Sequence, residues 1–115
     1  MARAATTSDV FNAIAEPKRR EILVLLRSGD WPVTELARAL GLSQPGTSKH
    51  LRVLREVGLV RDRRAGKQRL YDLDAQGLRA VHEWTGGFEQ FWTGSFDRLD
   101  AYVQERKQER KVDHE

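Results

Sequence analysis

Residues 43–58 read SQPGTSKHLRVLREVG, and this stretch decides the fold. Its first residues favour the start of a helix rather than its interior. Ser43 can cap a helix, because its hydroxyl can accept a hydrogen bond from the Gly46 N–H. Pro45 then falls in the first turn, where a missing N–H costs nothing. We therefore expect a helix over residues 44–57.

One face of this helix is apolar, and its C-terminal end is marked by glycine. Thr47, Leu51 and Leu54 recur at helical spacing, which predicts that they face the core. Gly58 suits the left-handed position that follows a helix, and Leu59 can pack back on Leu54. The opposite face keeps short polar and cationic side chains.

A second short helix is predicted directly before this one. Apolar residues in the segment 33–40 recur at i, i+3, i+4 and i+7, and Gly41 ends the pattern. Two short helices joined by a glycine-containing turn of three or four residues are typical of a helix-turn-helix.

Two further helices are expected upstream, over residues 9–15 and 17–28. Pro17 separates them, because proline favours a first helical turn and pushes the preceding residue out of the α region. The residues of the second helix that we expect to face inward are Ile22, Leu25 and Leu26.

The segment 60–73 predicts a β-hairpin rich in arginine. Val60 starts the first strand, Ala65-Gly66 supply the turn, and residues 69–73 form the return strand. A helix-turn-helix followed at once by a basic hairpin predicts a mainly α fold with a two-stranded β-hairpin wing, the winged helix-turn-helix.

Positive charge is concentrated in the middle of the chain. Residues 49–69 hold eight Lys/Arg against two acids, whereas residues 70–115 hold six against ten. On a chain of net charge +3, a local basic patch indicates a polyanionic partner that meets one surface. On charge alone, a merely solvated basic face is an equal alternative.

The outer face of residues 44–57 predicts contacts in the major groove of B-DNA, with the wing 60–73 on the backbone or minor groove. Gln bonds adenine, Lys bonds guanine, and Ser adapts to either. The residues expected to contact bases are Gln44, Ser48 and Lys49. The residues expected on the DNA backbone are Thr47, His50, Arg52, Arg55, Arg63, Arg64, Lys67 and Arg69. For His50, phosphate contact and simple packing are equal alternatives.

The C-terminal part is expected to form a dimer, because it carries more apolar surface than so small a domain can cover. Asp74 is expected to cap a helix whose apolar positions continue to Val103. The residues assigned to the dimer interface are Phe11, Ile14, Phe88, Phe91, Trp92, Phe96, Leu99 and Val103. The sequence leaves open whether Gly86-Gly87 kink or divide this helix, and whether its aromatics also accept a small apolar effector.

These patterns predict one domain with four stretches. Residues 1–8 are expected to be flexible, 9–74 to form the DNA-binding core, 75–103 to dimerise, and 104–115 to be a charged, disordered tail. The chain has no cysteine and no apolar run long enough to span a membrane, and we expect no secretory signal, because residues 1–11 lack an apolar core; we therefore expect a cytoplasmic protein.

Metal and enzyme sites are not predicted. His82 and Glu83 are neighbours on the C-terminal helix and His114 lies in the tail, too few ligands for a closed tetrahedral site. The sequence has no Gly-rich phosphate loop, paired carboxylate motif or activated nucleophile. We expect no cofactor, no metal and no catalytic activity.

The sequence resembles the ArsR family of bacterial winged-helix repressors. The resemblance covers about residues 9–74 and rests on FNAIAEPKRREILVLL (11–26), VTELARALGLSQPGTSKHLRVLREVGLV (33–60) and RLYDLD (69–74). The later FxxFW and FDRLDAYV are similar to the subgroup without metal ligands. Gly46 and Thr47 depart from the family, which usually has Ala or Ser and an aliphatic residue there.

The resemblance implies a homodimeric, promoter-binding repressor that often represses its own operon. It implies that the N-terminal helix packs against the partner's C-terminal helix, and that Gln44, Ser48 and Lys49 reach the groove. The alternatives are a winged helix that binds protein or RNA, and a repressor that responds to a metal or ligand.

Overall fold

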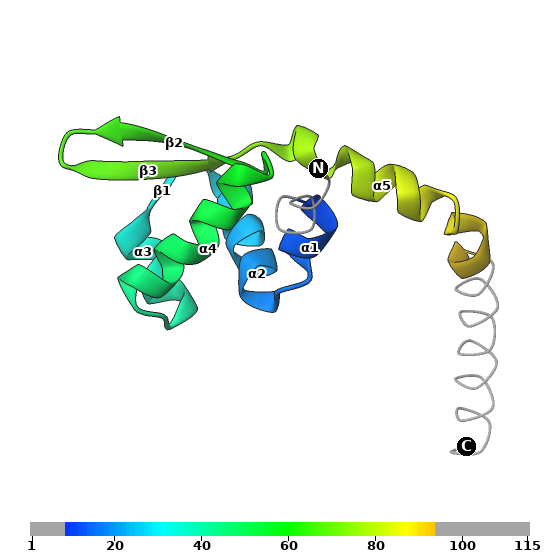
Figure 1. Ribbon diagram of the computed structural model, residues 1–115, viewed down its shortest axis with the longest axis horizontal. Helices are drawn as coiled ribbons and strands as arrows, with labels where there is room; N and C mark the ends of the chain where they lie inside the picture. The colour runs from blue at the N-terminus through cyan, green and yellow to red at the C-terminus, as the bar shows by residue number, and fades with distance from the viewer. Residues whose placement is uncertain (1–8, 94–115) are drawn as a thin grey trace, which may run out of the picture. The chain divides into compact units, whose positions relative to one another are not determined.

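The computed structural model describes residues 9–93, in two compact units that divide between Val81 and His82 (Figure 1). The expectations for residues 1–8 and 104–115, and for Phe96, Leu99 and Val103, lie outside the described residues. The elements are α1 (Val10–Ile14), α2 (Pro17–Leu25), the 3-10 turn η2 (Leu26–Ser28), β1 (Trp31–Pro32), α3 (Val33–Leu40), α4 (Gln44–Glu56), β2 (Val60–Ala65), β3 (Gln68–Leu73), the 3-10 turn η3 (Ala75–Leu78) and α5 (Arg79–Gly86).

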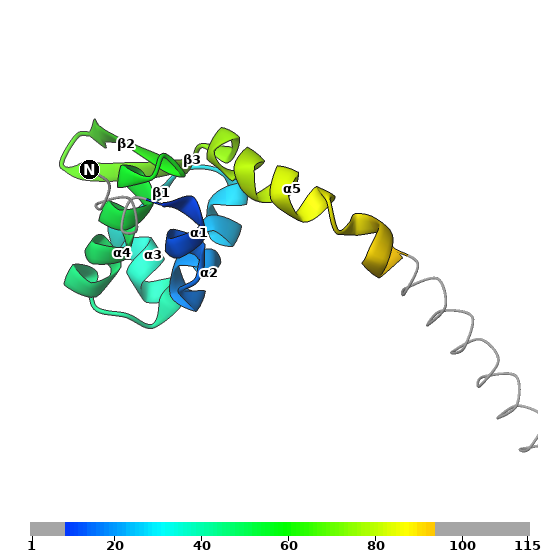
Figure 2. The same cartoon turned by 45° about the vertical axis from the view of Figure 1, so that its right-hand side comes forward.

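The fold is a winged helix-turn-helix. α3 and α4 are joined by a short turn, and the β2–β3 hairpin follows α4 directly. In Figure 1 the hairpin runs along the top of the first unit, above α3 and α4, and Figure 2 shows α1 and α2 beside them. None of the helices within residues 9–93 has the length and apolar character needed to cross a bilayer.

The ends of α3 and α4 are set by glycine, as expected. Gly41 follows α3 in the left-handed region at φ 69°. α4 ends in a Schellman motif, in which the Leu59 N–H donates to the Leu54 carbonyl at 2.9 Å and the Gly58 N–H to the Arg55 carbonyl at 3.0 Å. The first of these bonds brings Leu59 back into the core, where it is fully buried.

α2 differs from the expected helix in its last turn and in its buried face. The last turn is the tighter η2 rather than α-helix. Ile22 and Leu26 are buried as predicted, but Leu25 is only half-buried and Leu23 faces the core instead. Leu23 and Leu26 are three residues apart and therefore share one face.

Two arginines of α2 hold the C-terminal end of the short helix α1. Arg19 Nε donates to the Ala13 carbonyl at 2.6 Å, and Arg20 Nη1 donates to the Ile14 carbonyl at 2.8 Å. The last carbonyls of a helix lack partners within it, so these cationic donors satisfy them. α1 is thereby fixed to α2 although it has only five residues.

The core draws on α1 to α4 and on the base of the hairpin. Burial of each of its large aliphatic side chains stabilises the fold by roughly 1.5–3 kcal/mol. Its buried hydrophobic residues are Ala13, Ile22, Leu23, Leu26, Leu36, Ala37, Leu40, Leu51, Leu54, Leu59, Val60 and Tyr71.

The sheet has three strands rather than the expected two. β3 is central, and β1 pairs with it antiparallel so that Trp31 lies opposite Tyr71. β1 is only two residues long and includes a proline, so its pattern is too short to be read as a strand in the sequence.

The hairpin turn is shifted by one residue from the prediction. Ala65 pairs with Gln68, so the turn is Gly66-Lys67 rather than Ala65-Gly66. Gly66 is the first central residue of this two-residue turn and has φ 65°, which glycine adopts without strain.

The segment after the hairpin corrects one expectation and settles another. Asp74 makes no side-chain cap; its N–H donates to the Leu59 carbonyl at 2.8 Å, and the following turn is η3 rather than α-helix. α5 ends at Gly86, and after a turn at residues 87–88 the chain is helical again over residues 89–93. The glycine pair therefore divides the C-terminal helix.

Candidate nucleic-acid interface

The N-terminal end of α4 begins as the sequence predicts. Ser43 Oγ accepts a hydrogen bond from the Gly46 N–H at 3.1 Å. A Cβ atom on Gly46 would lie 3.1 Å from the same hydroxyl oxygen, which is unusually tight. Glycine therefore leaves room for the cap at this position, where the family usually has Ala or Ser.

Thr47 is a core residue, so its assignment to the DNA backbone is wrong. Its side chain is fully buried, with 0% exposure. Its hydroxyl donates to the Ser43 carbonyl at 2.9 Å, and a buried hydroxyl that is satisfied in this way costs little. Thr47 anchors the helix from the side opposite to its exposed face.

The outer face of α4 is polar and accessible. Gln44, Lys49 and Arg52 are exposed, and Ser48 is half-buried. Within residues 9–93, neither Lys49 nor Arg52 has an ion-pair partner. A helix whose one face is fully buried thus presents hydrogen-bond donors and acceptors on the other face.

His50 is held between helices. It is half-buried, and its Nδ1 lies 3.5 Å from Arg19 Nη1, the arginine that also caps α1. Both alternatives for His50, packing and phosphate contact, stay predictions.

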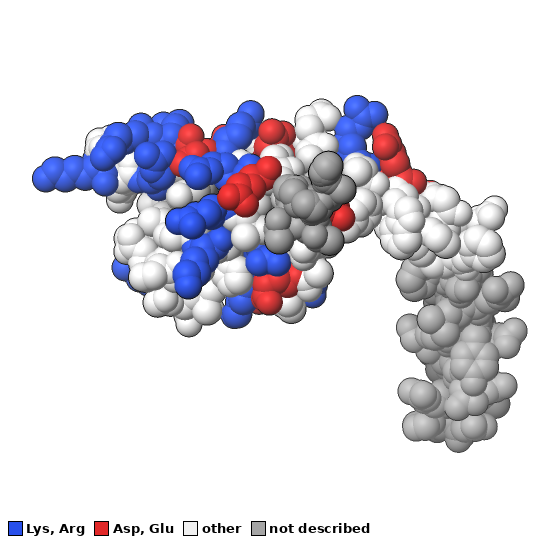
Figure 3. Space-filling view, in the orientation of Figure 1, with Lys and Arg blue, Asp and Glu red and all other residues white. Residues whose placement is uncertain are grey.

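The wing carries five Lys and Arg residues, and Figure 3 shows Lys and Arg side chains gathered over the hairpin and the neighbouring α4. Three of its arginines are paired with aspartates: Arg61 with Asp72 at 3.3 Å, Arg63 with Asp30 at 2.6 Å, and Arg69 with Asp62 at 2.7 Å. Among the described residues, Arg64 and Lys67 near the tip have no such partner. The tip is therefore the part of the wing with fully available charge.

Asp62 receives a second arginine from α4. Arg55 Nη1 lies 3.2 Å from Asp62 Oδ2, and only 11% of the Asp62 side chain is exposed. Burial raises the pKa of the neighbouring Tyr71 phenol above its ordinary 10.0; the Asp62 carboxylate adds to this rise, and Arg55 and Arg69 oppose it. Sequence reasoning missed these aspartate partners, although the run Arg61-Asp62-Arg63 places an acid inside the basic strand.

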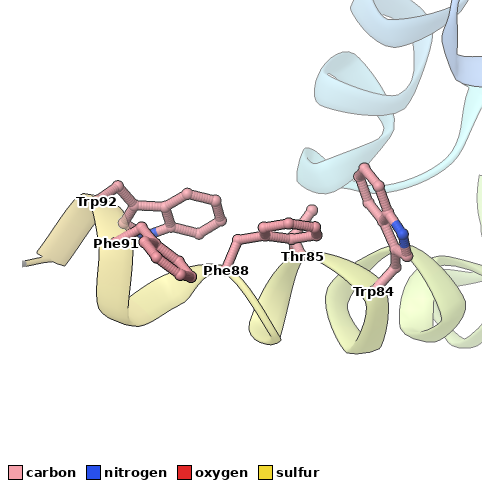
Figure 4. Close-up of a pocket in the computed structure, with 5 residues that line it drawn as sticks. All are labelled: Trp84, Thr85, Phe88, Phe91 and Trp92. Carbon is pink, nitrogen blue, oxygen red and sulfur yellow. The ribbon is translucent and has the colours of Figure 1, made fainter.

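The C-terminal segment exposes aromatic side chains. Phe88, Phe91 and Trp92 are 45%, 64% and 42% exposed, and Trp84, which was not assigned to the interface, is 60% exposed. Together with Thr85 these residues line an open apolar hollow of about 430 Å³ (Figure 4). The rings of Trp84 and Phe88 pack edge to face, with their centroids 5.2 Å apart.

The N-terminal members of the assigned interface are less uniform. Phe11 is 40% exposed, whereas Ile14 is half-buried against the core.

Within residues 9–93, no group of three or more His, Cys, Asp or Glu side chains could hold a metal ion, and His82 is exposed.

Comparisons with known proteins agree with this geometry. Residues 16–62 match the sequence profile of a family described as "Bacterial regulatory protein, arsR family". The chain is 43% identical over 94 residues to the HTH-type transcriptional regulator Rv2034 of Mycobacterium tuberculosis, which covers 82% of each chain. It is 47% identical over 96 residues to the HTH-type transcriptional regulator NmtR of the same organism, which covers 83% of this chain and 80% of that one.

Two further proteins bear on repression and assembly. The transcriptional repressor SdpR of Bacillus subtilis is 35% identical over 81 residues, or 70% of this chain and 90% of its own. A homodimeric winged helix-turn-helix DNA-binding domain from Mycobacterium bovis, determined by solution NMR, superposes with a TM-score of 0.58 at 30% identity, over 69% of this chain and 76% of that one.

Proposed function

This chain belongs to the ArsR family of bacterial regulatory proteins, and on that premise we propose that it is a homodimeric repressor that binds a palindromic operator. Its relatives are transcriptional regulators rather than enzymes. In the proposed complex, α4 enters the major groove and the β2–β3 wing lies on the backbone or minor groove. The protein acts in the bacterial cytoplasm on the nucleoid, and its own operon is a natural target.

The observation that carries the proposal is the division of α4 into two faces. One face is fully buried, whereas Gln44 and Lys49 on the other are exposed and Ser48 is half-buried. A Gln amide can bond adenine N6 and N7, and a Lys ammonium can bond guanine O6 and N7. These side chains lie in the first two turns, the part of a recognition helix that reaches the bases.

Phosphate contacts follow from which cations are available. Arg52, Arg64 and Lys67 have no ion-pair partner within residues 9–93, so binding phosphate costs them no existing bond. Arg55, Arg63 and Arg69 are ion-paired but still about half exposed, so their remaining N–H groups can reach phosphates.

Dimerisation supplies the second half-site. One helix reads only a few base pairs, whereas two helices about 34 Å apart can recognise two half-sites one helical turn apart. The exposed aromatics Phe88, Phe91 and Trp92 of the second unit are a surface that a second copy would cover, and Phe11 of α1 is a separate exposed aromatic of the first unit. The homodimeric state of the Mycobacterium bovis domain supports this arrangement.

A titration on the upstream region of its own gene tests the function. We expect the full-length protein to bind this duplex about a thousandfold or more tightly than a scrambled duplex of equal length, with affinity for both falling steeply as salt rises. Equal affinity for the two duplexes would refute sequence-specific regulation at this site.

Three variants separate base contacts from phosphate contacts. Gln44→Ala and Ser48→Ala should lower affinity for the operator by roughly tenfold each and leave scrambled DNA unaffected. Arg64→Ala should weaken both duplexes alike and reduce the salt slope by about two, one for each subunit of the dimer. Arg27→Ala, which removes the same charge from η2 outside α4 and the hairpin, is the control. The reverse pattern would show that the base and phosphate roles are exchanged.

A further inference from the structure

Asp62 joins the recognition helix to both strands of the wing. It lies on β2, and its Oδ2 is 2.7 Å from Arg69 Nη1 of β3 and 3.2 Å from Arg55 Nη1 of α4. One carboxylate therefore holds three elements that must act together on DNA.

The position of Asp62 in the sheet explains why its side chain is largely buried. It lies directly opposite Tyr71, and the buried Val60 precedes it by two residues, so its side chain shares the face of the sheet that meets the core. Only 11% of the side chain is exposed, so solvent screens its ion pairs less than those of a surface carboxylate.

A second aspartate on the same hairpin provides a contrast. Asp72 of β3 lies opposite Arg61 and pairs with it at 3.3 Å. This pair points to the other face of the two strands, has a 36% exposed carboxylate and involves no residue of α4. The two aspartates therefore carry the same charge on the same hairpin but differ in their connection to the recognition helix.

We propose that Asp62 is a positioning residue that sets the sequence specificity of the DNA complex, an inference that rests on the proposed function. Its carboxylate fixes α4 relative to the wing, so that base contacts from α4 and phosphate contacts from the wing tip fit one duplex together. It also occupies one Nη1 group each of Arg55 and Arg69, which would otherwise be available, like their remaining N–H groups, to the phosphates of any sequence.

The distinction matters because phosphate contacts add affinity without sequence information. Loss of the Asp62 carboxylate adds one net positive charge and releases Arg55 and Arg69. Random DNA should then bind more tightly. Operator binding should not improve in step, because the base contacts need the fixed arrangement of helix and wing.

The test compares full-length wild type, Asp62→Asn and Asp72→Asn on two duplexes over a series of salt concentrations. One duplex is the sequence that the wild-type protein enriches from a random pool, and the other is its scrambled version. Because each subunit of the dimer carries the substitution, Asp62→Asn should steepen the salt slope on scrambled DNA by about two, which is about 30-fold tighter binding near 0.15 M salt. Its preference for the enriched duplex should fall at least fivefold. Asp72→Asn adds the same charge but should leave the preference unchanged.

Arg55→Gln is the second variant, and it decides the question if Asp62→Asn does not fold. It breaks the connection from the α4 side while Asp62 keeps Arg69, and it removes a positive charge. Binding to scrambled DNA should weaken, yet the preference should again fall. A drop in preference from variants of opposite charge supports positioning rather than charge.

Four outcomes would overturn the inference. An unchanged preference in Asp62→Asn, or an equal drop in Asp72→Asn, shows that Asp62 contributes only charge. Equal weakening of both duplexes by Arg55→Gln shows that Arg55 is a plain phosphate contact. A wild-type protein that enriches no sequence refutes the proposed function itself, and the inference with it.

Discussion

α4 and α5 are both amphipathic helices, but the apolar face of α4 is buried whereas that of α5 is exposed. In α4, Leu51 and Leu54 are fully buried by the rest of the chain. α5 buries none of its residues, and the aromatic side chains on and after it, such as Trp84 and Phe91, are more than half exposed.

This difference distinguishes the apolar surface that a single chain buries by itself from the apolar surface that a partner would have to bury. Because the inner face of α4 is complete, its outer face can carry polar groups for recognition without cost to the core. Within residues 9–93 nothing buries the aromatic face beyond α5, and exposed aromatic clusters of this kind are typical of protein interfaces.

The largest expected effect is the loss of stability when a buried side chain of α4 is shortened. Leu54→Ala leaves a cavity in the core and should lower the free energy of unfolding by about 3 kcal/mol. Urea titration measures this change. Val24→Ala on α2 is the control, because that side chain is 57% exposed and its loss should cost less than about 1 kcal/mol. Similar losses for the two variants would contradict the burial of α4.

A substitution in the exposed aromatic face beyond α5 should change dimerisation rather than the stability of the fold. Phe91→Ala should raise the dimer dissociation constant about 30-fold, roughly 2 kcal/mol, because an interface aromatic is removed. Sedimentation equilibrium measures the constant. Gln90→Ala, its exposed polar neighbour, should change it little. If Phe91→Ala leaves the dimer intact, the aromatic face has another role.

Substitution of two glycines by alanine should change stability in opposite directions. A Cβ atom on Gly77 would lie 2.7 Å from both the Gly58 carbonyl oxygen and Leu59 Cδ2, so Gly77→Ala should destabilise by about 1–2 kcal/mol. A Cβ atom on Gly86 meets nothing within 4 Å, so Gly86→Ala should favour α5 by roughly 0.5–1 kcal/mol. Thermal unfolding should move the midpoints in opposite directions; a shared direction would show that one of these packing assignments is wrong.

The smallest effect concerns Tyr71, and it is confined to alkaline pH. Burial raises the folded-state pKa of its phenol above 10.0, so folding favours the protonated form. That contribution is complete below pH 10 and is lost as the pH rises through the folded-state pKa, at no more than about 1.4 kcal/mol per pH unit. Tyr71→Phe should therefore show a shallower decline above pH 10 in urea titrations. Parallel declines would mean that Tyr71 does not titrate with unfolding.

Local signals predicted the helix-turn-helix closely. Caps, glycine stops and apolar spacing act over a few residues, so the bounds of α3 and the start of α4 followed from the sequence. β1 and the one-residue shift of the hairpin turn did not, because strand pairing depends on residues far apart in the chain.

The candidate site was predictable only in its outer face. The exposed positions Gln44 and Lys49 follow from helical periodicity. Two expectations fell on Thr47: its full burial confirms that it faces the core and contradicts a contact with the DNA backbone, and its hydroxyl is satisfied within its own helix. The pairing of Arg55 and Arg69 with Asp62 required the tertiary structure, since any of several acids could have served.

The central claim is that α4 reads DNA sequence as part of a symmetric dimer. The most direct measurement is selection of bound duplexes from a random pool by the full-length wild-type protein, followed by sequencing. We predict enrichment of an inverted repeat whose half-site centres lie about 10 base pairs apart, one helical turn. A pool that stays random after selection would contradict the claim.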